Sequence, residues 1–315
     1  MSKYKYNVRE RNKRRKFFTG ITVLVLLIAS IIGVQLFLNR KSGDVGQAKT
    51  LDVQATNEES GNDNKSSEKE KNNETKKENK ALVANGLNMS EEGLKYADSG
   101  DIAQKVINNT YEKDGKKVAY LTFDDGPSTT VTPKILDVLK KEEVHGTFFL
   151  MGKNIKDDTK DILIRTLKDG HAIGNHSYSH DYKVLYPNRS INSAKVMEEY
   201  EAVNNKIREI VGQEFDTKVF RFPGGFMSWK NGQDIKNKFS EKGIHYIDWN
   251  ALNGDAEGKK RTSKELVQRA KDTVGNHEKV VILMHDTYGK ETTAEALPDI
   301  IKFLREQGYE FRTIK

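Results

Sequence analysis

Two neighbouring carboxylates and a spaced pair of histidines are the residues of this chain best suited to chemistry. Asp124 and Asp125 follow the apolar run 118–123 and precede a Gly-Pro turn, and His176 and His180 stand four positions apart about fifty residues later. Neighbouring acids repel each other, so such a pair usually persists where a cation holds it or where one acid serves as a base. Together these residues predict a metal site with a spare carboxylate beside it.

The histidine pair alone is weak evidence for a metal site, because two histidines at this spacing often lie together on the surface of a helix. Asp125 makes a metal site the better interpretation, since a carboxylate at the end of a strand is an oxygen ligand that completes an open three-ligand site. One carboxylate and two neutral imidazoles suit Zn²⁺ or a similar divalent ion, with water in the remaining position.

Three further segments place a polar residue at the end of an apolar stretch. Arg221 precedes a glycine turn with free backbone N–H groups, Asp248 stands beside Trp249, and His285 ends the run 280–285. Each segment also has an ordinary structural interpretation: a surface loop, an acid paired with an arginine near a half-buried tryptophan, and a core histidine with satisfied hydrogen bonds. Taken singly, these segments leave both interpretations open.

The elements that must position these residues alternate along the chain from residue 117. We expect strands at 118–123, 147–151, 171–174, 219–222, 244–249, 280–285 and 311–314, and helices at 132–142, 157–168, 191–211, 235–242, 263–274 and 294–306. Such alternation predicts an α/β fold with parallel strands and right-handed crossovers. Because the candidate residues stand at strand C-terminal ends, we expect a (β/α) barrel with its site at the C-terminal face rather than an open sheet.

The first 116 residues have a different composition. Residues 1–16 carry eight basic residues and one acid, a net charge of +7 that equals the net charge of the whole chain, so the high isoelectric point gives no support to nucleic-acid binding. Residues 17–38 are uncharged and would span about 33 Å as a helix, enough to cross a hydrocarbon core of about 30 Å. Residues 39–85 are charged and polar, which predicts a disordered linker. A lead-in segment (86–116) and one folded domain (117–315) follow.

We therefore expect a single-pass anchor in the cell membrane, with a cytoplasmic N-terminus and an extracellular folded domain. Basic residues are far denser before the apolar span than after it, where only Arg40 and Lys41 follow closely. The alternative, a cleaved signal peptide, fits less well because the span is longer than usual and no small-residue cleavage site follows. The chain has no cysteine, so its core alone must stabilise the domain.

Five segments, in this order, resemble the polysaccharide deacetylases with a NodB-homology domain, which form carbohydrate esterase family 4. The segments are TFDDGP (122–127), GNHSYSH (174–180), RFPGG (221–225), DW (248–249) and LMHD (283–286), and the resemblance covers about residues 115–315. It implies a distorted (β/α) barrel, often of seven strands, that removes acetyl groups from sugars. It also implies one divalent metal ion, foremost zinc, with cobalt, manganese and nickel as alternatives.

The resemblance assigns roles to the residues that match these motifs. Asp125, His176 and His180 would bind the metal, Asp124 would be the general base, and His285 would be the general acid. The remaining matches would support these five. Arg221 would hold Asp124, and Asp248 would pair with His285. Trp249 and Leu283 would form the walls of the acetyl pocket, and a backbone N–H near Gly224 would form the oxyanion site.

At one groove position the sequence departs from many members of that family. They have a tyrosine or phenylalanine where this chain has Gly224, so the groove loses an aromatic wall while the backbone N–H remains. Tyr178, Tyr182 and Tyr186 could line a sugar groove, although packing in the core or in a loop is the simpler interpretation of that series.

With the expected anchor, the resemblance implies an outward-facing enzyme that removes N-acetyl groups from amino sugars of a wall glycan, foremost N-acetylglucosamine of peptidoglycan. A deacetylase of poly-N-acetylglucosamine, chitin or acetylxylan is an alternative with the same catalytic residues. A non-catalytic wall-binding protein is a second alternative, and it would lack at least one of the five central residues. All five are present.

Overall fold

The computed structural model describes residues 82–84 and 86–315 of the chain. The expectations for the basic tail, the apolar span and nearly all of the linker concern residues outside this part. Among the helices that the structure describes, none has the length and the apolar character that crossing a membrane requires.

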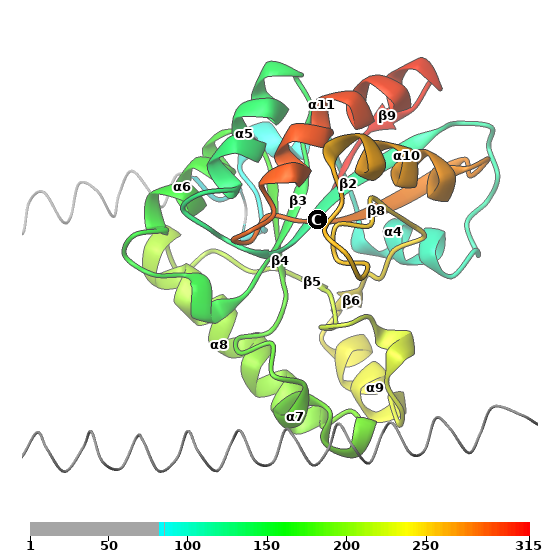
Figure 1. Ribbon diagram of the computed structural model, residues 1–315. Helices are drawn as coiled ribbons and strands as arrows, with labels where there is room; N and C mark the ends of the chain where they lie inside the picture. Colours follow the sequence, from blue (N-terminus) through cyan, green and yellow to red (C-terminus); the bar gives the residue numbers. More distant parts are fainter. Residues whose placement is uncertain (1–81, 85) are drawn as a thin grey trace, which may run out of the picture. The chain divides into compact units, whose positions relative to one another are not determined.

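One curled parallel sheet is the centre of the fold (Figure 1). Its strands follow each other in the order β6-β5-β4-β3-β2-β8-β7, and β9 pairs with the beginning of β2. Every ladder is parallel, so the strand C-terminal ends lie along one edge of the sheet. The bounds are β2 (Val118–Gly126), β3 (Thr147–Leu150), β4 (Ala172–Asn175), β5 (Val219–Phe220), β6 (His245–Tyr246), β7 (Ala251–Leu252), β8 (Lys279–His285) and β9 (Glu310–Phe311).

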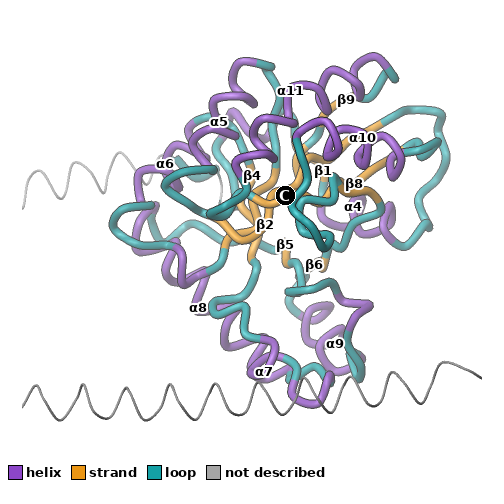
Figure 2. The backbone as a smooth tube through the Cα atoms, viewed as in Figure 1, coloured by secondary structure: helices purple, strands orange, loops and turns teal. Residues whose placement is uncertain are grey.

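Helices surround the strands, as Figure 2 shows by colour. The longer helices bury apolar stripes; α5, for example, buries Ile135, Leu136 and Leu139. Neighbouring helices contact each other in the order α10, α11, α5, α6, α8 and α9. The bounds are α5 (Thr132–Lys141), α6 (Lys160–Lys168), α7 (Tyr182–Leu185), α8 (Ser193–Val211), α9 (Gln233–Glu241), α10 (Ser263–Val274) and α11 (Glu291–Glu306).

The two faces of β2 lie in different environments because successive side chains of a strand alternate. Leu121 and Phe123 belong to the large apolar cluster shared with the surrounding helices. Tyr120 belongs to a second cluster, formed with inward residues of the other strands. The next two positions on this inner face are Thr122 and Asp124, which are polar and buried. The inside of the curl therefore changes from apolar to polar toward the C-terminal ends of the strands.

The lead-in segment packs against the apolar end of the inner face. Its helix α4 (Gly100–Ile107), which follows the short helix α3 (Glu91–Leu94), adds side chains to the inner cluster. Its strand β1 (Ala97–Asp98) pairs with β10 (Thr313–Ile314). The buried Asn88 side chain donates hydrogen bonds to backbone carbonyl oxygens of β4 and β10. These contacts join the two ends of the described chain.

The prediction of a parallel α/β fold is confirmed, and the barrel is present only in part. No ladder joins β6 to β7 within residues 86–315, so the seven-stranded path forms a half-barrel. The short segment between these strands nevertheless contacts both edges. The Ile247 N–H donates to the Phe220 carbonyl (2.8 Å), and the Asn250 N–H donates to the Val281 carbonyl (3.2 Å).

The predicted helices 132–142, 191–211 and 263–274 match α5, α8 and α10 to within two residues at each end. The predicted strand 244–249 is wrong beyond Tyr246, and β7 was not predicted. The strand ends after Tyr246 because of Arg221, the residue that follows β5. The carbonyl oxygens of Ile247 and Asp248 accept hydrogen bonds from the Arg221 side chain instead of from a neighbouring strand.

Candidate active site

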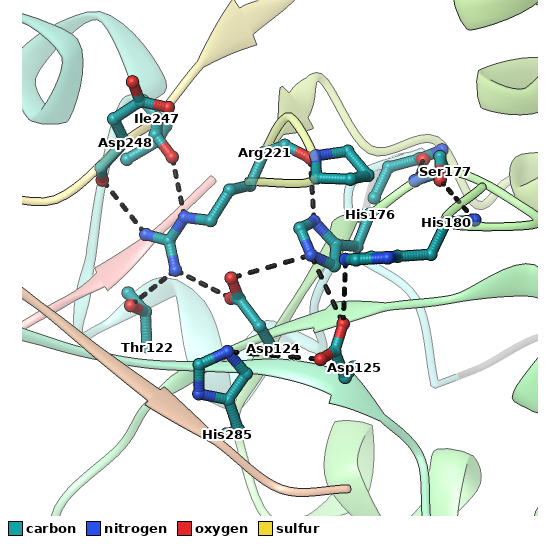
Figure 3. A network of polar contacts seen from close by, with 12 residues as sticks. Thr122, Asp124, Asp125, His176, Ser177, His180, Arg221, Ile247, Asp248 and His285 are labelled. Carbon is teal, nitrogen blue, oxygen red and sulfur yellow. Dashed lines mark hydrogen bonds and ion pairs between the residues drawn. The ribbon is translucent and has the colours of Figure 1, made fainter. Parts of the chain in front are cut away.

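A bulge in β2 brings two consecutive carboxylates to the same region. In a regular strand, adjacent side chains point to opposite faces. Here the register of β2 against β3 slips between Asp124 and Gly126, and Asp125 adopts a φ of 70°. A bulge of this kind redirects the extra side chain. Asp124 therefore faces the inside of the curl, while Asp125 faces the loop that follows β4 (Figure 3).

The loop after β4 carries both histidines of the motif, and they converge on Asp125 (Figure 3). The Nε2 atoms of His176 and His180 each lie 3.4 Å from Asp125 Oδ1. The three candidate ligand atoms all lie within 4.8 Å of one another. Asp125 Oδ1 is buried and has no hydrogen-bond partner in the described chain. A buried carboxylate oxygen without a partner is costly, and a cation between these three atoms would remove that cost.

His176 has the tautomer and the charge state that a metal ligand needs. Its Nδ1 lies 2.8 Å from the carbonyl oxygen of Arg221, so Nδ1 carries the proton and the Nε2 lone pair faces Asp125. Burial lowers the pKa of His176 to about 3, which keeps the imidazole neutral. The donor set therefore fits one divalent cation.

The backbone around these ligands is strained. Asp125, Ser177 and His180 have φ values of 70°, 63° and 54°, in the left-handed region that non-glycine residues seldom adopt. Local hydrogen bonds support this conformation: the Ser177 N–H donates to Asn175 Oδ1, and the His180 N–H donates to Ser177 Oγ, both at 3.1 Å. Strain of this kind gathers at functional sites, where the surrounding structure maintains it.

Glu199, which was not predicted from the sequence, holds the segment between the two histidines. Its Oε2 accepts the backbone N–H groups of Tyr178 (3.0 Å) and Ser179 (2.9 Å), and its Oε1 accepts the Ser179 hydroxyl (2.7 Å). A signal was available, because Glu199 shares the buried face of α8 with Val196 and Val203. An acid on the apolar stripe of a helix needs a partner.

Arg221 is completely buried inside the curl and fixes Asp124. Its Nη1 donates to Asp124 Oδ1 (2.7 Å) and to Thr122 Oγ1 (2.8 Å). Its Nε and Nη2 donate to the carbonyl oxygens of Ile247 (2.7 Å) and Asp248 (3.1 Å). The predicted contact between Arg221 and Asp124 is thus present, within a network that leaves the guanidinium little freedom.

His285 lies on the other side of Asp124, because β8 pairs with β2 in a register that places these two residues side by side. Its Nδ1 lies 2.7 Å from Asp255 Oδ1. The second oxygen of Asp255 accepts the His285 backbone N–H (2.8 Å) and the Thr293 hydroxyl (2.7 Å). Asp255 therefore fixes both the position of His285 and its tautomer.

The predicted pairing of Asp248 with His285 is wrong. Both carboxylate oxygens of Asp248 accept the backbone N–H of Phe226, at 2.9 and 3.0 Å, so this acid holds the turn that follows Arg221. Asp255 was not identified because it follows the two-residue strand β7, which has no alternating pattern. If β7 had been recognised in the sequence, Asp255 would have been identified as an acid that follows a strand.

Burial and nearby charges have opposite effects on the pKa values of Asp124 and His285, the two groups beside the ligand cluster. Burial raises the pKa of Asp124, and the charges of Arg221 and His285 lower it in part. Burial lowers the pKa of His285, but the hydrogen bond and charge of Asp255, with the charges of Asp124 and Asp125, outweigh it and raise the pKa to about 9. At neutral pH, His285 is therefore a protonated donor beside Asp124.

The predicted groove residues lie around this cluster. Gly224 is exposed in the turn after Arg221, and its N–H has no acceptor among the described residues. The Trp249 ring centroid lies 5.8 Å from the Arg221 guanidinium carbon. Leu283 stands two positions before His285 on β8, hence on the same face of that strand.

Known proteins resemble this chain in sequence and in fold. A family model described as polysaccharide deacetylase matches residues 111–247. The chain is 34% identical to the peptidoglycan-N-acetylmuramic acid deacetylase PdaA of Bacillus subtilis, over 66% of this chain and 72% of that protein. It is 36% identical to a peptidoglycan-N-acetylglucosamine deacetylase of Bacillus cereus, with the same two coverages. This chain belongs to the polysaccharide deacetylase family.

A solved structure agrees with this assignment. A carbohydrate esterase family 4 enzyme from Streptococcus mutans superposes on this polysaccharide deacetylase with a TM-score of 0.70 and 38% identity, over 75% of this chain and 99% of the other. The curled sheet is thus the fold of that family. Its members generally depend on a metal, and within the described part of the chain Asp125, His176 and His180 form a group that could hold one.

Proposed function

We propose that this polysaccharide deacetylase removes N-acetyl groups from amino sugars of a cell-wall glycan, foremost N-acetylglucosamine of peptidoglycan. The observation that carries the proposal is a pair of side chains next to the ligand cluster. The buried Asp124, held by Arg221, and the imidazolium of His285, held by Asp255, lie side by side on the neighbouring strands β2 and β8. Hydrolysis of an amide needs such a pair, because a proton must leave the attacking water and another must reach the departing amine.

The cofactor would be one divalent ion at Asp125, His176 and His180, foremost zinc, with cobalt, manganese or nickel as alternatives. When bound, such an ion activates water and polarises the acetyl carbonyl. The mixed nitrogen and oxygen donors support zinc, and three protein ligands leave positions open for water and substrate.

The side chains of this protein would divide the proton transfers. Asp124 accepts the proton of the attacking water at Oδ2, since Arg221 occupies Oδ1. Its pKa, raised by burial, strengthens its affinity for that proton. His285 donates its Nε2 proton to the amine nitrogen as the C–N bond breaks, while Asp255 keeps Nδ1 engaged. Acetate and a free amino sugar result.

The groove would hold the acetyl group in place for this reaction. The free N–H of Gly224 donates to the carbonyl oxygen, which becomes more negative as water adds. Trp249 and Leu283 contact the acetyl methyl group and exclude bulk water. Because these contacts involve only the acetamide, they leave the choice of sugar to residues further along the groove.

The choice of peptidoglycan rests on the printed activities of the relatives and on the anchor predicted from the sequence. Two relatives are named for peptidoglycan, one for each of its two amino sugars, at 36% and 34% identity. Such similar values do not separate the sugars. A membrane anchor at residues 17–38 and a flexible linker would keep the enzyme near the wall of its own cell, with its N-terminus in the cytoplasm.

Acetate release from defined glycans tests the proposed function. The full chain, loaded with zinc, is incubated with purified peptidoglycan, chitooligosaccharides and acetylxylan, and Asp125→Ala serves as the control. We expect release from peptidoglycan and none from the variant. Release of acetate from acetylxylan alone would reject peptidoglycan as the substrate. Release by Asp125→Ala at the wild-type rate would reject the metal site.

A further inference from the structure

An aromatic cluster lies next to the ligand His180 and has no role in the chemistry proposed above. The Tyr182 ring centroid lies 5.3 Å from that of His180 and 5.0 Å from that of Trp229. Trp229 stacks on Tyr186 with a centroid distance of 4.1 Å. The rings come from two segments, the helix α7 after the histidine loop and the turn after the RFPGG motif.

Tyr182 is the exposed member of this cluster and the others support it. Its exposure is 43%, whereas Tyr186 is 3% exposed. Trp229 is anchored by a hydrogen bond from Nε1 to the Pro223 carbonyl (2.9 Å). Asp181 caps α7 by accepting the Lys183 N–H (2.8 Å), which fixes the backbone that carries Tyr182. An aromatic face held rigidly at a site binds ligands at low entropic cost.

The hydroxyl of Tyr182 lies beside the turn that carries Gly224. A Cβ atom built on Gly224 would stand 3.1 Å from Tyr182 Oη and 3.2 Å from Trp229 Cζ2. The two rings therefore occupy the space that a side chain at position 224 would take. Tyr182 Oη has no hydrogen-bond partner in the described part of the chain, and neither has the N–H of Gly224. Two free donors thus lie close together beside the ligand cluster.

We propose that Tyr182, backed by Trp229, binds the sugar next to the one that is deacetylated, and so makes this enzyme selective for glycan chains over single sugars. The inference rests on the proposed function. The ring stacks on the apolar C–H face of a pyranose, and the hydroxyl hydrogen-bonds a sugar hydroxyl. Glycan recognition at this position thereby comes from the α7 segment, since Gly224 itself has no side chain.

Steady-state kinetics on N-acetylglucosamine oligomers of two to five sugars test this inference. We expect Tyr182→Ala to raise KM roughly 3- to 10-fold on the longer oligomers, as for the loss of one aromatic contact, and to leave hydrolysis of 4-nitrophenyl acetate unchanged. Tyr182→Phe keeps the ring and should show a smaller rise. Tyr111→Ala removes a tyrosine near Lys279, at the opposite end of the strands, and is the matched control.

Binding is measured separately from turnover by titrating chitotetraose into zinc-loaded Asp124→Asn and following tryptophan fluorescence. Adding Tyr182→Ala should weaken this binding by the factor seen in KM. Unchanged KM and unchanged binding would overturn the inference. A loss of ester hydrolysis as large as the loss on the oligomers would also overturn it, because Tyr182 would then act by supporting His180. Binding that depends on Tyr182 without any acetate release would support the subsite and reject the proposed function.

Discussion

Replacing Asp255 with asparagine should move the basic limb of the pH profile of kcat/KM. His285 donates a proton, so its active form is present below its pKa and is lost as the pH rises through that value. Asp255 is the largest cause that raises this pKa to about 9. Without the negative charge of Asp255, burial still lowers the pKa of His285, and only the charges of Asp124 and Asp125 raise it. We therefore expect the limb to fall to about the ordinary histidine value of 6.5.

The magnitude follows from the two protonated fractions. At pH 8, a group with a pKa of about 9 is nearly all protonated, whereas one with a pKa of about 6.5 is about 3% protonated, so activity should fall roughly 30-fold. At pH 6 the loss should be less than about 2-fold. The assay is acetate release from chitotetraose between pH 5 and 10 with the zinc-loaded enzyme.

Asp248→Asn is the matched control, because Asp248 contacts Phe226 and Arg221 and makes no described contact with His285. Its basic limb should stay at the wild-type pH. A limb that stays in place in Asp255→Asn, or one that moves only in Asp248→Asn, would refute the role given to Asp255.

The other variants separate metal binding, positioning and stability. Asp125→Asn should lose zinc and activity together, while Asp124→Asn should keep zinc and lose turnover, as metal analysis and acetate release would show. Glu199→Gln removes the negative charge and leaves a single acceptor oxygen for the three donors of the histidine loop, and should weaken zinc binding about 10-fold in a chelator competition; the exposed Glu198→Gln should not. Arg221→Met leaves a buried charge unpaired and should lower the free energy of unfolding by about 3–5 kcal/mol, less so when Asp124→Asn is added.

The sequence sufficed for the parts of the fold and site that depend on local pattern. Long apolar runs predicted β2 and β8, and motif residues after them predicted where Asp125 and His285 would lie. The contact between Arg221 and Asp124 followed from the family motifs, and the structure contains it.

The rest depends on tertiary contacts that have no local pattern. β7 has two residues and exists because it lies beside β8, so neither it nor Asp255 could be found from periodicity. Glu199 lies on a helix far from the motif loop and contacts it only after folding. β6 likewise ends after Tyr246 because the distant Arg221 takes the carbonyl oxygens of Ile247 and Asp248.

A zinc titration of metal-stripped enzyme tests most directly whether Asp125, His176 and His180 hold the ion that makes this protein a deacetylase. Acetate release from peptidoglycan is measured as zinc is added in steps. We predict no release without zinc, and a rise that levels off at one equivalent per chain. Full release before any zinc is added, or no release at any zinc concentration, would contradict this.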